Sequence, residues 1–401
     1  MRGNSAIAVV ALLAAVIGGA IGLVGGKATG VGNERTRTVY LAGGGQDLAT
    51  AGAEPAVASM RPLLGNGFNP ARIYAARSPG VVTIFAFFEQ GDTHAAQGSG
   101  FVVSPRGYIL TSAHVVTDAG DSATTHGASR VFVGFKDGDR ISATIVGWDV
   151  YDDVALLRVD PAAHRLASVP LGNSARVQAG DPVAAMGSPF GNEDSIAVGV
   201  VSAVHRSIAS LTSTYKVVDA IQTDAPITHG NSGGPLFDAR GRVIGINAQI
   251  RSDTGESQGV GFAVPINAAR RSMGQLVAIG HVVYAFLGVT TEDLTPTLAR
   301  HFGSGARRGA IIASVKGGSP AAAAGLHGGN KEESFNGQTV TRGGDIIVAV
   351  DDEPVGSADD VVRLVSEKLP GAIVRLTIVR GGKDRVVRVR LGARPEAPTN
   401  G

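Results

Sequence analysis

Residues 228–236 read Thr-His-Gly-Asn-Ser-Gly-Gly-Pro-Leu and hold one serine, Ser232, between glycines just ahead of an apolar run. Gly230 and the pair Gly233-Gly234 lack a Cβ, so the backbone can turn sharply there and approach a substrate closely. Serine becomes a useful nucleophile only with a base beside it and N–H donors for the oxyanion that develops. The backbone N–H groups of Gly230 and Ser232 are candidates for such an oxyanion hole. Taken alone, the stretch fits a glycine-rich hairpin turn with an incidental serine equally well.

Two upstream residues decide between these interpretations. His114 directly follows the strand-like run 108–111, and a histidine with a pKa of ~6.5 can accept and return a proton at neutral pH. Asp153 opens the apolar run 153–159. A carboxylate at the head of a buried strand needs a partner, and an imidazole N–H would serve. Asp152 is the alternative, and we favour Asp153 because it directly abuts the strand.

The chain order His114, Asp153, Ser232 is that of chymotrypsin-like barrels and differs from the order in subtilisin or the α/β-hydrolases. The strand pattern agrees, because short apolar runs separated by turn residues are typical of an all-β barrel or sandwich. These runs are 81–88, 98–104, 108–111, 130–135, 141–148 and 154–159, then 182–187, 195–206, 216–223, 234–237, 243–250 and 260–264. The sequence therefore predicts a mainly β fold, a chymotrypsin-like double six-stranded β-barrel with a Ser-His-Asp triad. A closing helix is expected after Pro265, ending at Gly280.

Beyond residue 282 the pattern changes to that of a separate α+β module. Strand-like runs near 284–290, 308–315, 345–351, 373–379 and 385–391 alternate with helical stretches at 320–325 and 357–368. The polar segment 328–344 is predicted as an extended loop or hairpin within this module. The expected domains are a membrane segment at 1–27, a flexible linker at 28–68, the double barrel at 69–281, the α+β module at 282–394 and a loose tail at 395–401.

The N-terminal segment and the composition indicate where the protein acts and which partners and cofactors it has. Ala6 to Gly26 is uncharged and apolar, long enough for a bilayer core, which needs ~20 residues. It is either an uncleaved signal anchor or a cleaved signal peptide. We favour a transmembrane anchor with the body outside the cytoplasm, because the run is long and no clear cleavage site follows. A net charge of +2 without a long basic run argues against a nucleic-acid partner. The absence of cysteine excludes disulfides and thiolate metal sites, and no metal or cofactor is expected.

Five segments together resemble the HtrA (Deg) family, which are trypsin-fold serine proteases that carry a PDZ domain. These segments are Gln97–Phe101, Thr111–Val116, Asp153–Leu156, Gly230–Leu236 and Gly259–Pro265. The resemblance covers residues 69–394. It implies an ATP-independent endopeptidase of the cell envelope that degrades unfolded or misfolded proteins or processes signalling substrates, assembled as a homotrimer. Thr228 and His229 depart from the residues that many members have before Gly-Asn-Ser.

Two positions near the nucleophile refine the expected activity. Asn231 stands where secreted trypsin-like enzymes carry an Asp that pairs with a newly cut N-terminus, so activation by that route is not expected. Pro226 stands six positions before Ser232, where trypsin-like enzymes place the Asp at the base of the specificity pocket. With Ile227 and Ile250 as neighbours, the pocket is expected to be apolar and to select small or aliphatic residues.

The C-terminal module carries its own motif. Phe286-Leu287-Gly288-Val289 resembles the carboxylate-binding loop of PDZ domains, and the segments 318–326 and 344–350 resemble those that follow it. Such a domain adds a peptide as an extra strand and holds its C-terminal carboxylate with loop N–H groups. We expect it to recruit substrate or gate activity. Two alternatives stay open: a largely latent peptide sensor or chaperone with a rarely activated protease fold, and a small-ester hydrolase.

Overall fold

The computed structural model describes residues 67–88, 95–119, 125–188, 195–213, 216–227, 230–248 and 260–395. All of them belong to the compact unit Val57–Gly401. The predicted membrane segment, most of the linker and the end of the tail lie outside these ranges. Within them, no helix is long and apolar enough to cross a membrane.

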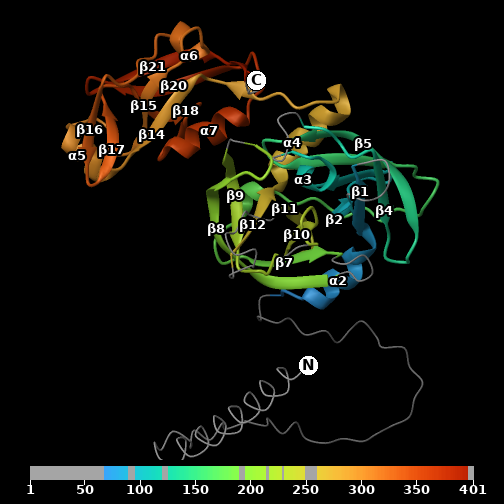
Figure 1. The fold of residues 1–401 in the computed structure, drawn as a ribbon. Coiled ribbons are helices and arrows are strands. Elements are labelled where there is room, and N and C mark those ends of the chain that lie inside the picture. Colours follow the sequence, from blue (N-terminus) through green and yellow to red (C-terminus); the bar gives the residue numbers. More distant parts are fainter. Residues whose placement is uncertain are drawn as a thin grey trace, which may run out of the picture. The chain divides into compact units, whose positions relative to one another are not determined.

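The first barrel closes from six antiparallel strands in the order β1-β2-β3-β6-β5-β4 (Figure 1). They are β1 (Val81–Phe87), β2 (Ala95–Val102), β3 (Tyr108–Thr111), β4 (Arg130–Gly134), β5 (Arg140–Asp149) and β6 (Val154–Val159). Side chains that alternate along each strand point inward, and Ile84, Ile109 and Leu157 are fully buried in its interior.

The second barrel closes in the order β10-β11-β12-β9-β8-β7. Its strands are β7 (Pro182–Gly187), β8 (Ser195–Ala209), β9 (Lys216–Thr223), β10 (Pro235–Asp238), β11 (Val243–Ala248) and β12 (Gly261–Pro265). The prediction of two six-stranded barrels is therefore confirmed. Closing each sheet on itself removes the free strand edges that an open sheet would expose.

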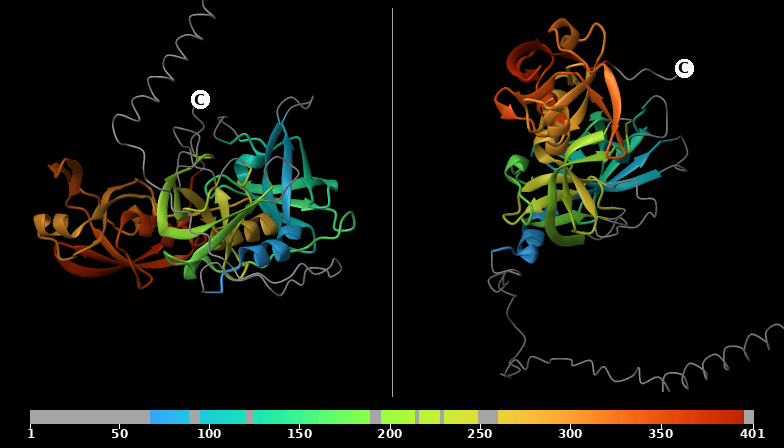
Figure 2. Two further views of the ribbon diagram at one scale, coloured as in Figure 1. Left: turned by 90° about the horizontal axis from the view of Figure 1, so that it is seen from below. Right: turned by 90° about the vertical axis from the view of Figure 1, so that its left-hand side faces the viewer.

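One apolar cluster is shared by the two barrels. Phe101 and Leu156 of the first barrel pack with Met186 and Phe237 of the second. The helix α4 (Ile266–Ile279) covers this junction and contacts β5, β6 and β11 (Figure 2). It ends at Gly280, whose left-handed φ of 77° suits a residue without a Cβ, as predicted. The helix α2 (Pro70–Arg77), capped by the Asn69 side chain, was not predicted.

The C-terminal module is built on a sheet of order β14-β15-β18-β20-β21, with β19 (Glu353–Pro354) paired to β18. The strands are β14 (Val289–Leu294), β15 (Gly309–Val315), β18 (Ile346–Val350), β20 (Ile373–Arg380) and β21 (Lys383–Arg390). The helix α7 (Ala358–Ser366) begins at a capping box between Ser357 and Asp360 and buries Val361 and Leu364. Among the described strands, β14 pairs only with β15, so one edge of it is left for a further strand.

Smaller elements complete the module. The pair β13 (Ala285–Phe286) and β22 (Gly392–Ala393) joins its two ends. The predicted helix at 320–325 is the short α6 (Pro320–Ala323), and α5 (Pro296–Phe302) was not predicted. The segment 328–344 contains a hairpin of β16 (Lys331–Phe335) and β17 (Gln338–Arg342), one of the two predicted conformations.

Candidate active site

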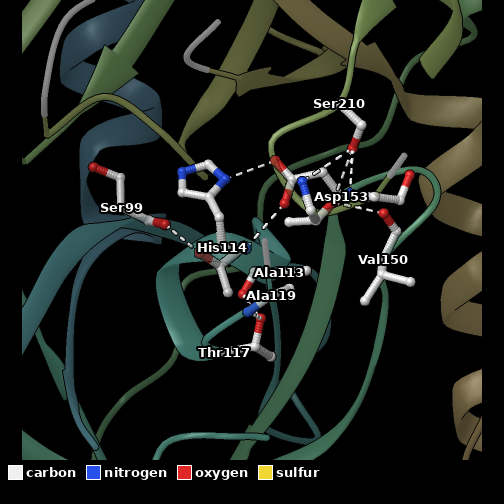
Figure 3. A network of polar contacts seen from close by, with 11 residues as sticks. Ser99, Ala113, His114, Thr117, Ala119, Val150, Asp153 and Ser210 are labelled. Atoms are coloured by element: carbon white, nitrogen blue, oxygen red, sulfur yellow. Dashed lines mark hydrogen bonds and ion pairs between the residues drawn. The ribbon is translucent and has the colours of Figure 1, made fainter. Parts of the chain in front are cut away.

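His114 and Asp153 form a hydrogen-bonded pair at one end of the first barrel. His114 lies in the single-turn helix α3 (Ala113–Val116), directly after β3, and Asp153 lies in the turn between β5 and β6. One carboxylate oxygen, Oδ2, lies 2.7 Å from His114 Nδ1, and the other, Oδ1, accepts the His114 backbone N–H at 2.9 Å (Figure 3). With Nδ1–H donated to the carboxylate, Nε2 is the ring nitrogen left to accept a proton.

The surroundings of this pair tune its proton affinity. Burial by itself lowers the pKa of His114, but the charge of Asp153 and its hydrogen bond more than offset that effect. The net result is a pKa of His114 above its ordinary value of 6.5. Asp153 is only 4% exposed and adopts a left-handed backbone with a φ of 52°, which Asp tolerates better than most residues. The arrangement stabilises an imidazolium, as a general base requires.

Ser232 lies in the turn before β10 and is 5% exposed. Its Oγ makes no hydrogen bond to any described residue. The structure thus contains a complete His-Asp pair and a serine hydroxyl without a partner among the described residues. The preceding Thr228 and His229 lie outside those residues.

The glycines of this turn are required by both conformation and space. Gly230 and Gly233 have φ values of 101° and 83°, in the left-handed region. A Cβ on Gly233 would overlap the carbonyl oxygen of Ser99 and the hydroxyl of Thr111. The proposed oxyanion donors, the N–H groups of Gly230 and Ser232, flank Asn231 in this tightly enclosed turn.

Only part of the predicted specificity pocket lies within the described residues. Ile227 is buried and packs in the interior cluster of the second barrel. A Cβ on Gly261 would lie 2.9 Å from its Cδ1, so these two residues face each other closely. The carbonyl of Pro226 accepts a long 3.4 Å hydrogen bond from the Asn231 amide. Ile250 lies outside the described residues.

The predicted peptide-binding loop connects β13 to β14. Leu287 is buried in the core of the C-terminal module, whereas Phe286 and Val289 are half-buried. Gly288 has a φ of 84°, and a Cβ there would overlap the side chain of Ser319. The loop therefore needs this glycine, and it runs directly into the strand whose edge is open.

Sequence reasoning missed the polar side chains that hold residues 230–234, the turn that carries the proposed nucleophile Ser232 and is called the nucleophile turn below. Asn247 is fully buried and donates to the carbonyls of Met186 and Pro235. Ser99 is also fully buried and contacts the turn itself. The available signal was a serine flanked by Gly98 and Gly100 within a strand. Across the described residues, no group of three or more His, Asp or Glu side chains could hold a metal ion.

Comparisons with known proteins agree with both modules. Residues 98–246 match a trypsin-like peptidase domain, and residues 285–391 match a PDZ domain. A probable periplasmic serine endoprotease, DegP-like, from Halomonas elongata is 39% identical over 300 residues, which is 75% of this chain and 57% of the relative. The corresponding protein of Pseudomonas fulva is 39% identical over 298 residues, 74% of this chain and 56% of the relative. The chain thus spans little more than half the length of these curated relatives.

This chain aligns with almost the whole length of solved structures that have the same architecture. The HtrA-type protease AlgW with a tripeptide is 32% identical with a TM-score of 0.65, covering 82% of this chain and 98% of that one. The serine endoprotease from Yersinia pestis is 28% identical with a TM-score of 0.55, again covering 82% of this chain and 98% of that one.

Proposed function

Because the chain belongs to the HtrA (Deg) family of serine proteases, we propose that it is an extracytoplasmic serine endopeptidase with His114, Asp153 and Ser232 as its triad. The observation that carries the proposal is the two-point grip of Asp153 on His114, at 2.7 Å and 2.9 Å, which fixes the ring and its tautomer. A carboxylate that holds an imidazole in this way keeps it in the orientation and tautomer in which Nε2 can accept the proton of a serine hydroxyl.

The proposed reaction follows from these positions. Ser232 Oγ attacks the scissile carbonyl carbon while His114 Nε2 takes its proton, and Asp153 stabilises the resulting imidazolium. The N–H groups of Gly230 and Ser232 stabilise the negative oxygen of the tetrahedral intermediate. His114 then returns the proton to the leaving amine. Water, activated by His114, finally releases the acyl group from Ser232.

The proposed substrates are unfolded or misfolded proteins cut after small or aliphatic residues. Support comes from Pro226, which stands six positions before Ser232 where trypsin-like enzymes carry an Asp, and from the apolar surroundings of Ile227. Ile250 is proposed as a further pocket residue.

The PDZ domain is proposed to bind peptide C-termini, as a recruiting site or as a gate. The open edge of β14 supports strand addition, and the loop Phe286-Leu287-Gly288-Val289 leads directly into that edge.

The setting is the cell envelope, since the relatives are named as periplasmic. Anchoring by Ala6–Gly26 and assembly as a homotrimer are part of the proposal and rest on the sequence alone.

A second candidate is favoured by one observation, that Ser232 Oγ makes no hydrogen bond to any residue that the structure describes. A serine that is not hydrogen-bonded to its base fits a resting state, so the protein would be a largely latent peptide sensor or chaperone that is rarely activated. The two candidates share the triad and differ in whether turnover needs a peptide signal.

The test uses the full-length chain in detergent with casein as an unfolded substrate, beside its Ser232→Ala variant. Cleavage by the parent alone, after Val, Ala or Leu, is the expected result. Cleavage that appears only after adding hydrophobic C-terminal peptides supports the latent sensor. Equal cleavage by both proteins contradicts the role of Ser232, and preferential cleavage after Arg or Lys contradicts the apolar pocket.

A further inference from the structure

Ser99 is a buried polar residue that the proposed mechanism leaves unused. It lies in β2 of the first barrel, opposite Thr83 of β1, and is fully inaccessible to solvent. Burying a hydroxyl is unfavourable unless its hydrogen bonds are made. The partners of this residue therefore indicate what it does.

Every polar group of Ser99 is hydrogen-bonded. Its backbone N–H donates to the carbonyl of Ser232 at 2.8 Å. Its Oγ donates to the carbonyl of Gly230 at 2.5 Å and accepts the backbone N–H of Ser188 at 2.8 Å. Its carbonyl accepts the Thr111 hydroxyl at 2.6 Å. Ser99 thus holds the nucleophile itself and the residue two positions before it.

Three of these bonds, those to Gly230, Ser232 and Ser188, cross from one barrel to the other. Ser99 and Thr111 belong to the first barrel, which also carries His114 and Asp153, whereas Ser232 lies in a turn that enters the second barrel at β10. The relative position of Ser232 and His114 is therefore set at the contact where Ser99 meets the turn.

The space around the Ser99 side chain is tightly filled by neighbouring backbone. A Cβ on Gly187 would lie 2.9 Å from Ser99 Oγ, and one on Gly234 would lie 3.1 Å from Ser99 Cβ. Because the surrounding backbone is this close, a lost hydrogen bond cannot be replaced by a water molecule in the same space.

We propose that Ser99 is a positioning residue for the oxyanion hole. By holding the Gly230 carbonyl, its hydroxyl fixes the peptide that links Gly230 to Asn231. Its backbone N–H fixes the peptide that follows Ser232. The N–H of Ser232 lies between these two peptides, and the N–H of Gly230 belongs to the peptide directly before them, so the direction of both proposed oxyanion donors depends on Ser99. The inference rests on the proposed endopeptidase activity.

A neighbouring hydroxyl provides the matched control. Thr83 is 3% exposed, lies beside Ser99 and donates to the Ser188 hydroxyl at 2.5 Å. That bond also joins the two barrels, yet it does not touch the nucleophile turn. Thr83→Val therefore removes a buried bond of the same kind without releasing Gly230.

The experiment compares the full-length parent with Ser99→Ala and Thr83→Val on a peptide ester substrate. Misplacing reacting groups by about 1 Å can cost about 100-fold in rate. We expect Ser99→Ala to lower kcat by about 10- to 100-fold with KM within about threefold, and to weaken a peptide aldehyde inhibitor, which binds as a tetrahedral adduct, in proportion. The pH midpoint of activity should stay unchanged, because the His114–Asp153 pair is untouched. Thr83→Val should retain kcat.

Backbone amide exchange gives a readout that needs no activity. Ser99→Ala should speed exchange across residues 230–234, and Thr83→Val should not. A parent that cleaves nothing would count against the proposed function, while the exchange comparison would still decide the role of Ser99. If Ser99→Ala does not fold, Ser99→Gly, which removes the same hydroxyl and adds no bulk to this tight contact, should show the same loss in kcat. Unchanged kcat and exchange in a folded Ser99 variant would overturn the inference.

Discussion

The hydroxyl of Tyr284 donates a 2.6 Å hydrogen bond to the carboxylate of Asp149, which is buried four residues before Asp153. The Ser272 hydroxyl donates to the same carboxylate at 2.6 Å, and the backbone N–H of Asp152 donates to it at 3.3 Å. A buried carboxylate with this many donors anchors its loop firmly. That loop carries the proposed triad member Asp153, so Tyr284, which directly precedes the matched PDZ residues 285–391, supports the loop that holds Asp153.

Asp152 should make the protein less stable as the pH rises. Burial, followed by the charge of Asp149, raises the pKa of Asp152 from 3.8 to about 7. Between these two pH values, the folded state therefore holds a proton on Asp152 that the unfolded state has already released. This contribution to stability is fully present below pH 3.8 and is lost as the pH rises through about 7.

Melting temperatures at pH 5 and pH 8 check this prediction. Asp152→Asn should show a smaller drop between the two pH values than the parent does. The exposed Asp160→Asn is the control and should follow the parent. An identical drop in all three proteins would contradict the assignment.

The pH dependence of activity should follow His114. Its pKa lies above 6.5, so kcat/KM should rise with pH through a midpoint above that value. In the same range the pair loses stabilising energy, because a raised folded pKa favours the folded state only while the ring is protonated. Asp153→Asn removes the charge that raises the pKa, so the midpoint should shift to lower pH and kcat should fall by about 10⁴-fold. An unchanged midpoint in this variant would rule out the pairing as its cause.

Gly233→Ala tests how tightly the nucleophile turn is enclosed. The added methyl group would meet both a left-handed φ of 83° and the overlap with Ser99 and Thr111. Gly138 has a similar φ of 89° but nothing within 4 Å of a Cβ, so Gly138→Ala isolates the conformational cost, about 1–2 kcal/mol. Urea unfolding should show a clearly larger loss for Gly233→Ala, together with loss of esterase activity. Equal losses would mean that the turn has room.

Arg380→Ala should destabilise the PDZ domain selectively. Arg380 Nε and one terminal nitrogen each lie 2.6 Å from an oxygen of Asp345, a carboxylate that is 1% exposed. Removing the arginine strands a buried charge, at a cost of about 3–5 kcal/mol. The exposed Arg385→Ala is the control, since Arg385 makes no ion pair with any described residue.

Two spectroscopic probes separate the domains in this experiment. The PDZ domain has its own apolar clusters, and the single tryptophan, Trp148, lies in β5 of the first barrel. Circular dichroism should therefore report an early transition in Arg380→Ala, while tryptophan fluorescence keeps the parent midpoint. Coincident shifts by both probes would contradict selective destabilisation.

The features that the sequence predicted well are those encoded locally. Strand periodicity and turn residues predicted the two barrels, and the residue types around His114 and Asp153 led to a pair that the structure brings together. Gly280 marked the end of α4 because a helix often ends at a left-handed glycine.

The features that escaped prediction depend on residues far apart in the chain. The bond from Ser99 to Gly230 spans 131 positions, and the glycines on either side of Ser99 mark a close approach without indicating its partner. The left-handed backbone of Asp153 is likewise a feature that the local sequence does not indicate. The helix α5 was missed because its seven residues are too few for a clear helical period.

The apolar cluster that joins the two barrels affects how well this protein would resist cleavage by other copies of itself. Because Phe101 and Leu156 share a core with Met186 and Phe237, unfolding of either barrel exposes apolar side chains that the other barrel keeps buried. This exposure is unfavourable, so molecules with only one barrel unfolded are scarce, and such molecules are the substrates that the proposed cleavage of unfolded chains would attack. Under the proposed activity, cooperative unfolding of the two barrels would thus limit the cleavage of one copy by another.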